Sequence, residues 1–128
     1  MKSTEKKRIL IVDNSPMWIT YLVHLLRDDY ELFVAINGTV AIKVAEDEVP
    51  HLIFLDVNMP DMSGYEVCEH LKAIDKTKNI PIIFFTATDT EEDMGIGKQL
   101  GAVGYLQKNV AQDVVKEKVR EYFEKIDQ

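Results

Sequence analysis

The stretch Leu52-Ile53-Phe54-Leu55 is a continuous apolar run that ends at Asp56, and it decides the fold of this chain. A strand buried on both faces reads as an unbroken apolar run, whereas a strand with one solvated face alternates. Four other short runs, rich in β-branched and aromatic residues, share this character. They are Ile9–Val12, Leu32–Ile36, Ile80–Phe85 and Val103–Leu106. We therefore expect five parallel strands covered by helices.

The segments between these runs have apolar residues at helical spacing, so helices are expected to connect the strands. The first segment opens with Ser15, a good N-cap, and Pro16, which suits a first helical turn. The apolar stripes of the first, second, third and last segments are Trp18, Leu22, Leu25 and Leu26; Val40, Ala41, Val44 and Ala45; Val67, Cys68, Leu71 and Ile74; and Val115, Val119, Tyr122 and Ile126. Each stripe is expected to pack on the sheet, and for Trp18 core packing is the expected role.

Strand alternating with helix five times is typical of an α/β sheet with helices on both faces, joined by right-handed crossovers. Five strands favour the flavodoxin-like order 2-1-3-4-5 over a six-stranded dinucleotide-binding fold. The length of 128 residues fits one domain. We expect a basic N-terminal tail over residues 1–8 and a single doubly wound domain over residues 9–126.

Composition excludes several classes of protein. The net charge is −7, from 15 basic and 22 acidic side chains, so direct binding to nucleic acid is not expected. No apolar run is long enough for a transmembrane helix or a signal peptide, so no membrane association is expected. The single cysteine, Cys68, excludes an internal disulfide and fits the reducing cytoplasm.

Polar residues follow four of the five runs. Asp13 and Asp56 follow the first and third runs, Thr86 follows the fourth and Lys108 follows the fifth. Because ligands of such folds bind at the carboxyl ends of the strands, we expect these side chains to converge on one rim. Two carboxylates there are compatible with a metal site, an acid/base pair or a carboxylate nucleophile. With the lysine and the hydroxyl added, they are similar to a cradle for a phosphoryl group carried on an aspartate.

Four motifs then carry a family resemblance. They are Ile9-Leu10-Ile11-Val12-Asp13-Asn14-Ser15-Pro16, Leu55-Asp56-Val57-Asn58-Met59-Pro60-Asp61-Met62-Ser63-Gly64, Phe85-Thr86-Ala87 and Tyr105-Leu106-Gln107-Lys108. In this order the chain resembles the receiver domain of bacterial two-component response regulators, the CheY-like fold. The resemblance spans almost the whole chain and implies a phosphorelay component rather than a turnover enzyme.

The resemblance implies specific roles for the residues at the rim. Asp56 would accept a phosphoryl group from a sensor histidine kinase or a phosphotransfer protein. Mg²⁺ would be held by Asp13, Asn14, Asp56 and the backbone carbonyl of Asn58. Lys108 would pair with Asp56 at rest and with the phosphate afterwards.

The resemblance also implies how the signal leaves the site. Thr86 would move to bond the phosphoryl group, and Tyr105 would turn inward behind it. This shift would alter the surface of the fourth helix, fifth strand and fifth helix. The implied partners there are a downstream protein, an effector domain, or a second copy of the chain in a homodimer. Asn58 and Thr88 would tune the lifetime of the phosphate.

Two positions depart from the family pattern. Asn14 stands where a second acid is usual, so we expect weaker Mg²⁺ binding, slower phosphorylation and a more easily ionised Asp56. Asn109 follows Lys108 where a cis-proline is usual. A cis bond before a non-proline residue costs about 3–4 kcal/mol, so either a trans bond or a strained cis bond follows Lys108.

The fourth helix is expected to start near Thr90, with Asp93 as a weak capping partner. Gly95 and Gly97 fall inside this segment and each costs about 1 kcal/mol relative to alanine. Either the glycines make the helix mobile or they allow close packing or an early helix end; mobility is the preferred hypothesis.

Three alternative functions remain at this point. A flavin carrier shares the fold, but no phosphate-binding loop follows the first strand. A Mg²⁺-dependent phosphohydrolase would need an Asp-x-Asp pattern, which Asp13-Asn14-Ser15 lacks. A degenerate receiver that binds proteins without phosphorylation is favoured by Asn14 and Asn109 and opposed by Asp56, Thr86 and Lys108.

Overall fold

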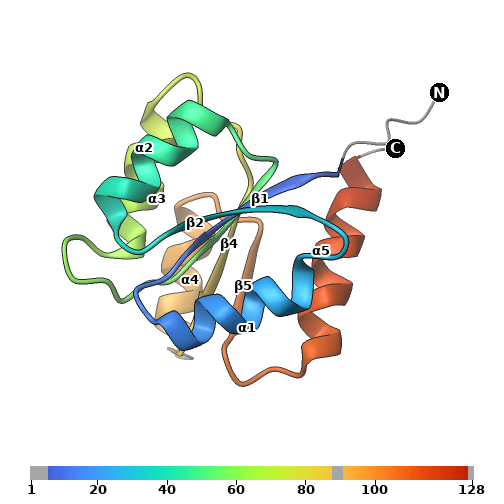
Figure 1. Cartoon of the computed structure of the whole chain (residues 1–128). Helices are drawn as coiled ribbons and strands as arrows, with labels where there is room; N and C mark the ends of the chain where they lie inside the picture. The colour runs from blue at the N-terminus through green and yellow to red at the C-terminus, as the bar shows by residue number, and fades with distance from the viewer. Residues whose placement is uncertain (1–5, 88–90, 127–128) are drawn as a thin grey trace.

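A twisted sheet lies at the centre of the chain, with helices on both of its faces (Figure 1). The computed structural model describes residues 6–87 and 91–126. Strands and helices alternate along this part of the chain. They are β1 (Arg8–Val12), α1 (Pro16–Leu26), β2 (Glu31–Ala35), α2 (Gly38–Glu48), β3 (Leu52–Leu55), α3 (Gly64–Ala73), β4 (Ile82–Thr86), α4 (Glu91–Gln99), β5 (Gly104–Gln107) and α5 (Gln112–Ile126).

The five strands are parallel and lie in the order β2-β1-β3-β4-β5, which confirms the expected topology. The register aligns the carboxyl ends of the central strands, because Val12 pairs with both Ala35 and Leu55. The backbone N–H of Asp56 donates to the carbonyl oxygen of Val12 at 3.0 Å. The residues that follow β1 and β3 therefore start side by side.

Alternate residues of each central strand enter two different cores. Leu10, Ile53 and Phe84 pack under α2 and α3, whereas Ile9 and Phe54 pack under α1 and α5. These residues are all at most 1% exposed, so β1, β3 and β4 are buried on both faces. Their continuous apolar character follows from this double burial. None of the helices in the described ranges has the length and hydropathy that a bilayer crossing requires.

Local signals set the helix starts. Ser15 is the N-cap of α1 and its Oγ accepts from the Trp18 N–H, with Pro16 in the first turn, as expected. Asn37 caps α2 in the same way, through the N–H of Val40. Ser63 begins α3 with a reciprocal capping box that it shares with Glu66.

Several expected details differ in the structure. The expected strand Leu32–Ile36 ends at Ala35, and Ile36 is 59% exposed. Val40 is 41% exposed, because the inward row of α2 consists of Ala41 and Ala45, whose small side chains let the helix lie close to the sheet. The expected strand Ile80–Phe85 begins later, at Ile82, and includes Thr86. The side chain of Ile126 lies outside the described ones.

Candidate functional site

Two aspartates lie at the carboxyl end of the sheet, directly after neighbouring strands. Asp13 follows β1 and is 2% exposed, and Asp56 follows β3 and is 4% exposed. The Asp13 carboxylate accepts from the Ser15 N–H at 2.9 Å, which fixes the turn into α1. The Asp56 carboxylate accepts from the backbone N–H groups of Val57 and Asn58. The structure thus holds two buried carboxylates in place from the backbone.

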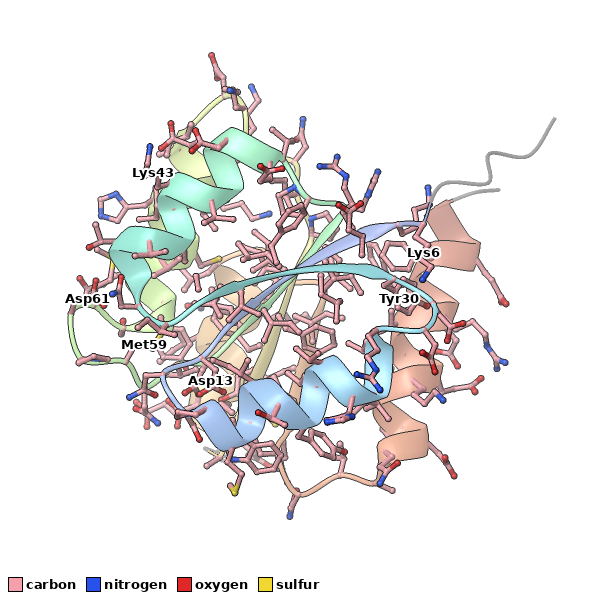
Figure 2. All side chains as sticks on the ribbon, in the orientation of Figure 1. Lys6, Asp13, Tyr30, Lys43, Met59 and Asp61 are labelled. Carbon is pink, nitrogen blue, oxygen red and sulfur yellow. The ribbon has the colours of Figure 1, made fainter. Side chains whose placement is uncertain are left out.

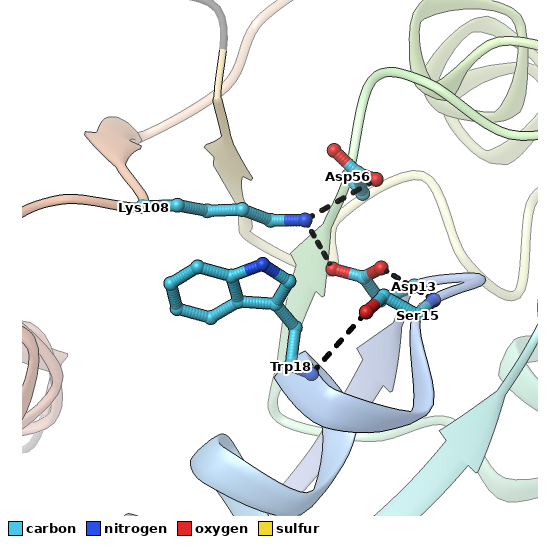
Figure 3. A network of polar contacts seen from close by, with 5 residues as sticks. All are labelled: Asp13, Ser15, Trp18, Asp56 and Lys108. Carbon is cyan, nitrogen blue, oxygen red and sulfur yellow. Dashed lines mark hydrogen bonds and ion pairs between the residues drawn. The ribbon is translucent and has the colours of Figure 1, made fainter.

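Lys108 brings a positive charge to both carboxylates from the far side of β4. Its backbone N–H donates to the Thr86 carbonyl oxygen at 2.9 Å, so the chain after β5 is tied to the end of β4. Its Nζ lies 2.8 Å from Asp13 Oδ2 and 3.5 Å from Asp56 Oδ2, and the side chain is 9% exposed. Figure 3 shows the ammonium between the two carboxylates. The expected convergence of both carboxylates and the amine is therefore present; we refer to Asp13, Asp56 and Lys108 as the acidic cluster.

The charges of this cluster are not balanced. Burial raises the pKa of the Asp56 carboxyl, and the neighbouring Asp13 raises it further. The Lys108 ammonium and the two backbone N–H groups lower the pKa of Asp56 but do not cancel the rise. Two buried acids with one ammonium therefore retain an excess of negative charge. Such a site favours a further cation.

The residues at this rim fit a magnesium ion. Mg²⁺ uses one or two carboxylates and keeps several waters, and Asp13 and Asp56 supply two carboxylates. Asn14 and Asn58 follow these residues in the same two loops and are exposed to solvent. Within residues 6–87 and 91–126, no group of three or more His, Cys, Asp or Glu side chains is placed to hold a metal. Any magnesium held at this rim would have at most these two acids as charged protein ligands from the described residues, with amide or carbonyl oxygens beside them.

Thr86 and the bond after Lys108 complete the rim. Thr86 is the last residue of β4, fully buried between β3 and β5, rather than the first residue beyond the strand. No cis peptide bond occurs in the described residues, so Lys108 and Asn109 are joined by a trans bond. Of the two geometries that the sequence left open, the structure has the unstrained one.

Comparison with known proteins identifies the family to which this chain belongs. The family model of the response regulator receiver domain matches residues 9–120. This chain is a receiver domain. It is 34% identical over 109 residues to the protein PilH of Pseudomonas aeruginosa, a match that covers 84% of this chain and 90% of PilH. It is 36% identical to a probable cyclic di-GMP phosphodiesterase of Vibrio cholerae, covering 97% of this chain but 28% of that protein.

Solved structures agree with this assignment. The chemotaxis protein CheY4 of Vibrio cholerae matches with a TM-score of 0.85 and 29% identity, over 91% of this chain and 98% of that one. Receiver domains belong to two-component signalling and are signalling domains rather than turnover enzymes. They are phosphorylated by histidine kinases or phosphotransfer proteins. The predicted family is confirmed.

Gly64 shapes the loop between Asp56 and α3. A Cβ at this residue would collide with the carbonyl oxygen of Asp56. The Gly64 N–H donates to the Val57 carbonyl oxygen at 2.8 Å, which folds the loop back on itself. Glycine is therefore required here by close backbone approach. The motif included Gly64, but its contact with Asp56 depends on the folded loop.

Asp61 fastens the same loop to α2, a role that the sequence analysis missed. Its carboxylate accepts from the N–H groups of Gly38 and Thr39, each at 2.9 Å, and from the Thr39 hydroxyl at 2.8 Å. Figure 2 shows Asp61 beside the start of α2. These bonds hold the pKa of the Asp61 carboxyl well below its usual range. An acid facing a helix N-terminus is a recognisable signal, but only once the two segments are known to meet.

Tyr105 lies on β5 in a small group of rings and polar atoms that joins α3, α4 and the sheet. Its ring is 6.0 Å from that of Phe84, and its hydroxyl is hydrogen-bonded to that of Tyr65 on α3. The Tyr65 hydroxyl also donates to Asp93 Oδ1 on α4 at 3.1 Å. A Cβ on Gly97 would lie 3.1 Å from Phe84 and 3.2 Å from Tyr105. We call Tyr65, Phe84, Asp93, Gly97 and Tyr105 the α4 anchor.

The structure tests two of the sequence-based interpretations of the glycines in α4, close packing and an early helix end. Gly97 allows close packing, because its missing side chain leaves room for two rings, whereas Gly95 faces open space. Neither glycine ends the helix, which continues to Gln99. Asp93 accepts a hydrogen bond from Tyr65; Thr90, the expected start, and Thr88 lie outside the described residues. The mobility of α4 stays a prediction.

Proposed function

We propose that Asp56 accepts a phosphoryl group, and that the acidic cluster promotes this transfer in a Mg²⁺-dependent reaction. The observation that carries the proposal is the Lys108 ammonium beside two buried carboxylates that belong to neighbouring strands. In this proposal the Asp56 carboxylate reacts, while the Asp13 carboxylate, which is paired with Lys108 in this structure, helps to bind Mg²⁺. The membership of the chain in the receiver family supports the same assignment.

In the proposed transfer, an oxygen of the Asp56 carboxylate forms a bond to the phosphorus of the donor. The phosphorus–nitrogen bond of a phosphohistidine breaks, and the histidine nitrogen leaves with the bonding electrons. Lys108, 3.5 Å from Asp56 Oδ2, lies where it can neutralise charge on the phosphoryl oxygens. When bound by Asp13, Asp56 and their neighbouring amide and carbonyl oxygens, Mg²⁺ supplies further positive charge for these oxygens. The same arrangement would promote hydrolysis of the product.

The output would pass from the rim to the α4-β5-α5 surface. Phe84 and Thr86 point to the same face of β4, since side chains two residues apart share a face. Thr86 ends the strand beside the acidic cluster, and Phe84 contacts Tyr105 in the α4 anchor. A shift of Thr86 toward a phosphoryl group would therefore change the packing of Phe84 against Tyr105 and α4. The partners proposed for this surface are a downstream protein, an effector domain or a second copy of the chain.

The proposal is tested by intact mass after incubation with acetyl phosphate and Mg²⁺. Wild type should gain one phosphate, and Asp56→Asn should gain none. The control Asp47→Asn, which changes an exposed acid on α2, should gain as wild type does. Labelling of Asp56→Asn to the level of wild type would contradict the assignment of the acceptor.

Asn14 provides a second arm of this test. If wild type gains no phosphate and Asn14→Asp does, the cluster is competent and its cation affinity limits the reaction. If neither gains phosphate, even with a histidine kinase as donor, the domain is a binding module that acts without phosphorylation. A Mg²⁺ titration of both proteins measures the affinity that Asn14 is expected to weaken.

A further inference from the structure

An aromatic wall closes the acidic cluster on the side of α1. Trp18 is the third residue of α1 and is half-buried. The Lys108 Nζ lies over its ring, 5.2 Å from the ring centroid. This distance is within the roughly 6 Å at which an ammonium is attracted to the face of an indole, the strongest of the aromatic partners. Figure 3 shows the ring below the stem of Lys108.

The ring is held in this position by the fold rather than by Lys108. The backbone N–H of Trp18 donates to Ser15 Oγ at 3.5 Å, at the N-cap of α1. The indole meets Tyr21 edge-on at 5.3 Å and Phe85 edge-on at 5.6 Å. Phe85 is 1% exposed and packs in turn on Phe54. The wall is therefore built on buried rings of the α1/α5 core and has a fixed orientation.

The ammonium needs a fixed wall, because Lys108 carries its charge on a flexible four-carbon stem. Among the described residues, Asp13 and Asp56 both lie close to Nζ, together with the ring of Trp18. Under the proposed function both carboxylates take other partners during the reaction, a cation or a phosphoryl group. The indole of Trp18 carries no charge and exchanges no partner in the proposed transfer. Among the contacts of the ammonium with described residues, it is therefore the one that the proposed reaction leaves unchanged.

We propose that Trp18 is a positioning residue for Lys108: its indole face holds the ammonium beside the two carboxylates, whether these are free or engaged. The contact itself does not depend on phosphorylation. Its consequence, a faster transfer to Asp56, rests on the proposed function. The two parts are therefore measured separately.

The contact is tested by a double-mutant cycle on stability in the absence of phosphate and Mg²⁺. Trp18→Leu removes the π face and keeps an apolar side chain, and Lys108→Met removes the charge. The two changes should be coupled by about tenfold in the unfolding equilibrium constant, or about 1.4 kcal/mol. Met17→Leu is the matched control, since Met17 precedes Trp18 in the same helix and is 67% exposed. It should show no coupling to Lys108→Met.

The consequence is tested by the initial rate of phosphorylation with acetyl phosphate. Trp18→Leu should be slowed by about three- to tenfold, and Trp18→Phe, which keeps a weaker π face, by less. A purely structural role predicts that the two rates follow the stabilities of the two variants. Absence of coupling in the cycle overturns the contact, and unchanged rates beside a clear coupling overturn the positioning role. If neither wild type nor Asn14→Asp gains phosphate, from acetyl phosphate or from a histidine kinase, the proposed function fails, and the cycle alone decides on Trp18.

Trp18 is the single tryptophan of the chain, which adds an independent optical readout. Folded Lys108→Met should differ from wild type in emission, because an ammonium beside an indole alters its emission. Lys43→Met changes an exposed lysine on α2 and should leave the emission unchanged. Identical emission of Lys108→Met and wild type would contradict the contact, provided that both proteins have the same far-ultraviolet circular dichroism.

Discussion

The acidic cluster and the α4 anchor lie on the same receiver domain but are stabilised in different ways. The cluster consists of charged side chains that are almost completely buried, and the negative charges of its two carboxylates repel each other. The anchor consists of three aromatic rings, two tyrosine hydroxyls, the half-buried Asp93 that one of them reaches, and a glycine; Gly97 is the one buried residue of α4. A change of charge should therefore act strongly at the cluster and weakly at α4. A change in side-chain volume should act strongly at the α4 anchor and weakly at the acidic cluster.

This difference suits a switch. Under the proposed function, a phosphoryl group would alter the charge at a buried site, where the low dielectric strengthens each electrostatic interaction. The helix that would respond has one buried residue, Gly97, so we expect a small free energy to be enough to move it. β4 links the two regions through Thr86 at the rim and Phe84 in the anchor.

The largest expected effect is that of Lys108→Met, which should lower the free energy of unfolding by about 3 kcal/mol, because it leaves two buried carboxylates without their cation. Urea unfolding in EDTA measures the change. The control Lys98→Met removes an exposed lysine of α4 and should stay within about 0.5 kcal/mol of wild type. Adding Asp13→Asn to Lys108→Met should recover part of the loss. Equal effects of the two lysines would remove the contrast between the regions.

The two glycines of α4 should show the importance of shape at the anchor. Gly95→Ala places its methyl group in open space and should stabilise the protein by up to about 1 kcal/mol. Gly97→Ala has the same helical gain, but its Cβ presses on Phe84, which is fully buried. Overpacking of this kind costs about 1–3 kcal/mol, so the net effect should be destabilising. Thermal unfolding of the pair gives the difference directly; stabilisation by both would show that the anchor has room.

Asp56→Asn should stabilise the protein at neutral pH, although it removes a partner of Lys108. The pKa of Asp56 is raised in the folded state, so the folded protein binds this proton more tightly than the unfolded chain. The stability of wild type relative to the variant then falls as pH rises above the ordinary value of 3.8, and levels off above the raised pKa. Lys108 keeps its nearer partner, Asp13. Urea midpoints across the acid range check this; a destabilised variant would mean that the ion pair outweighs burial and repulsion.

Much of this architecture could be predicted from the sequence, because double burial leaves a direct trace in it. The run Leu52–Leu55 coincides with β3, and the strand order follows from the alternation of strands and helices. Strand ends were less certain. Pro81 was placed inside a strand, but it lies before Ile82, where its carbonyl accepts from Ile53. The positions of Asp13, Asp56 and Lys108 could be predicted together because each follows a strand.

The remaining features depend on side-chain packing between segments far apart in the chain. Trp18 was expected to pack in the core, and it does, but nothing in the spacing of α1 indicates that its other face meets Lys108. The bonds of Asp61 to α2 and of Tyr65 to α4 join elements that only the fold brings together. Residue patterns predict which face of an element is buried; they do not predict which partner it meets.

The smallest expected effect on stability is that of Tyr65→Phe, and it bears most directly on the mobility predicted for α4. The change removes the hydroxyl that reaches Asp93 and Tyr105 and keeps the ring that meets Phe84 edge-on at 5.3 Å. A half-buried hydrogen bond contributes about 0.5 kcal/mol, so global stability should hardly change. Amide exchange in α4 should nevertheless quicken, because the remaining contacts of this helix are few. Tyr21→Phe makes the same deletion on α1 and should leave α4 unaffected. Strong protection of α4 in wild type, unchanged in Tyr65→Phe, would mean that its packing on Phe84 and Tyr105 suffices, and that the mobility inferred from its glycines is wrong.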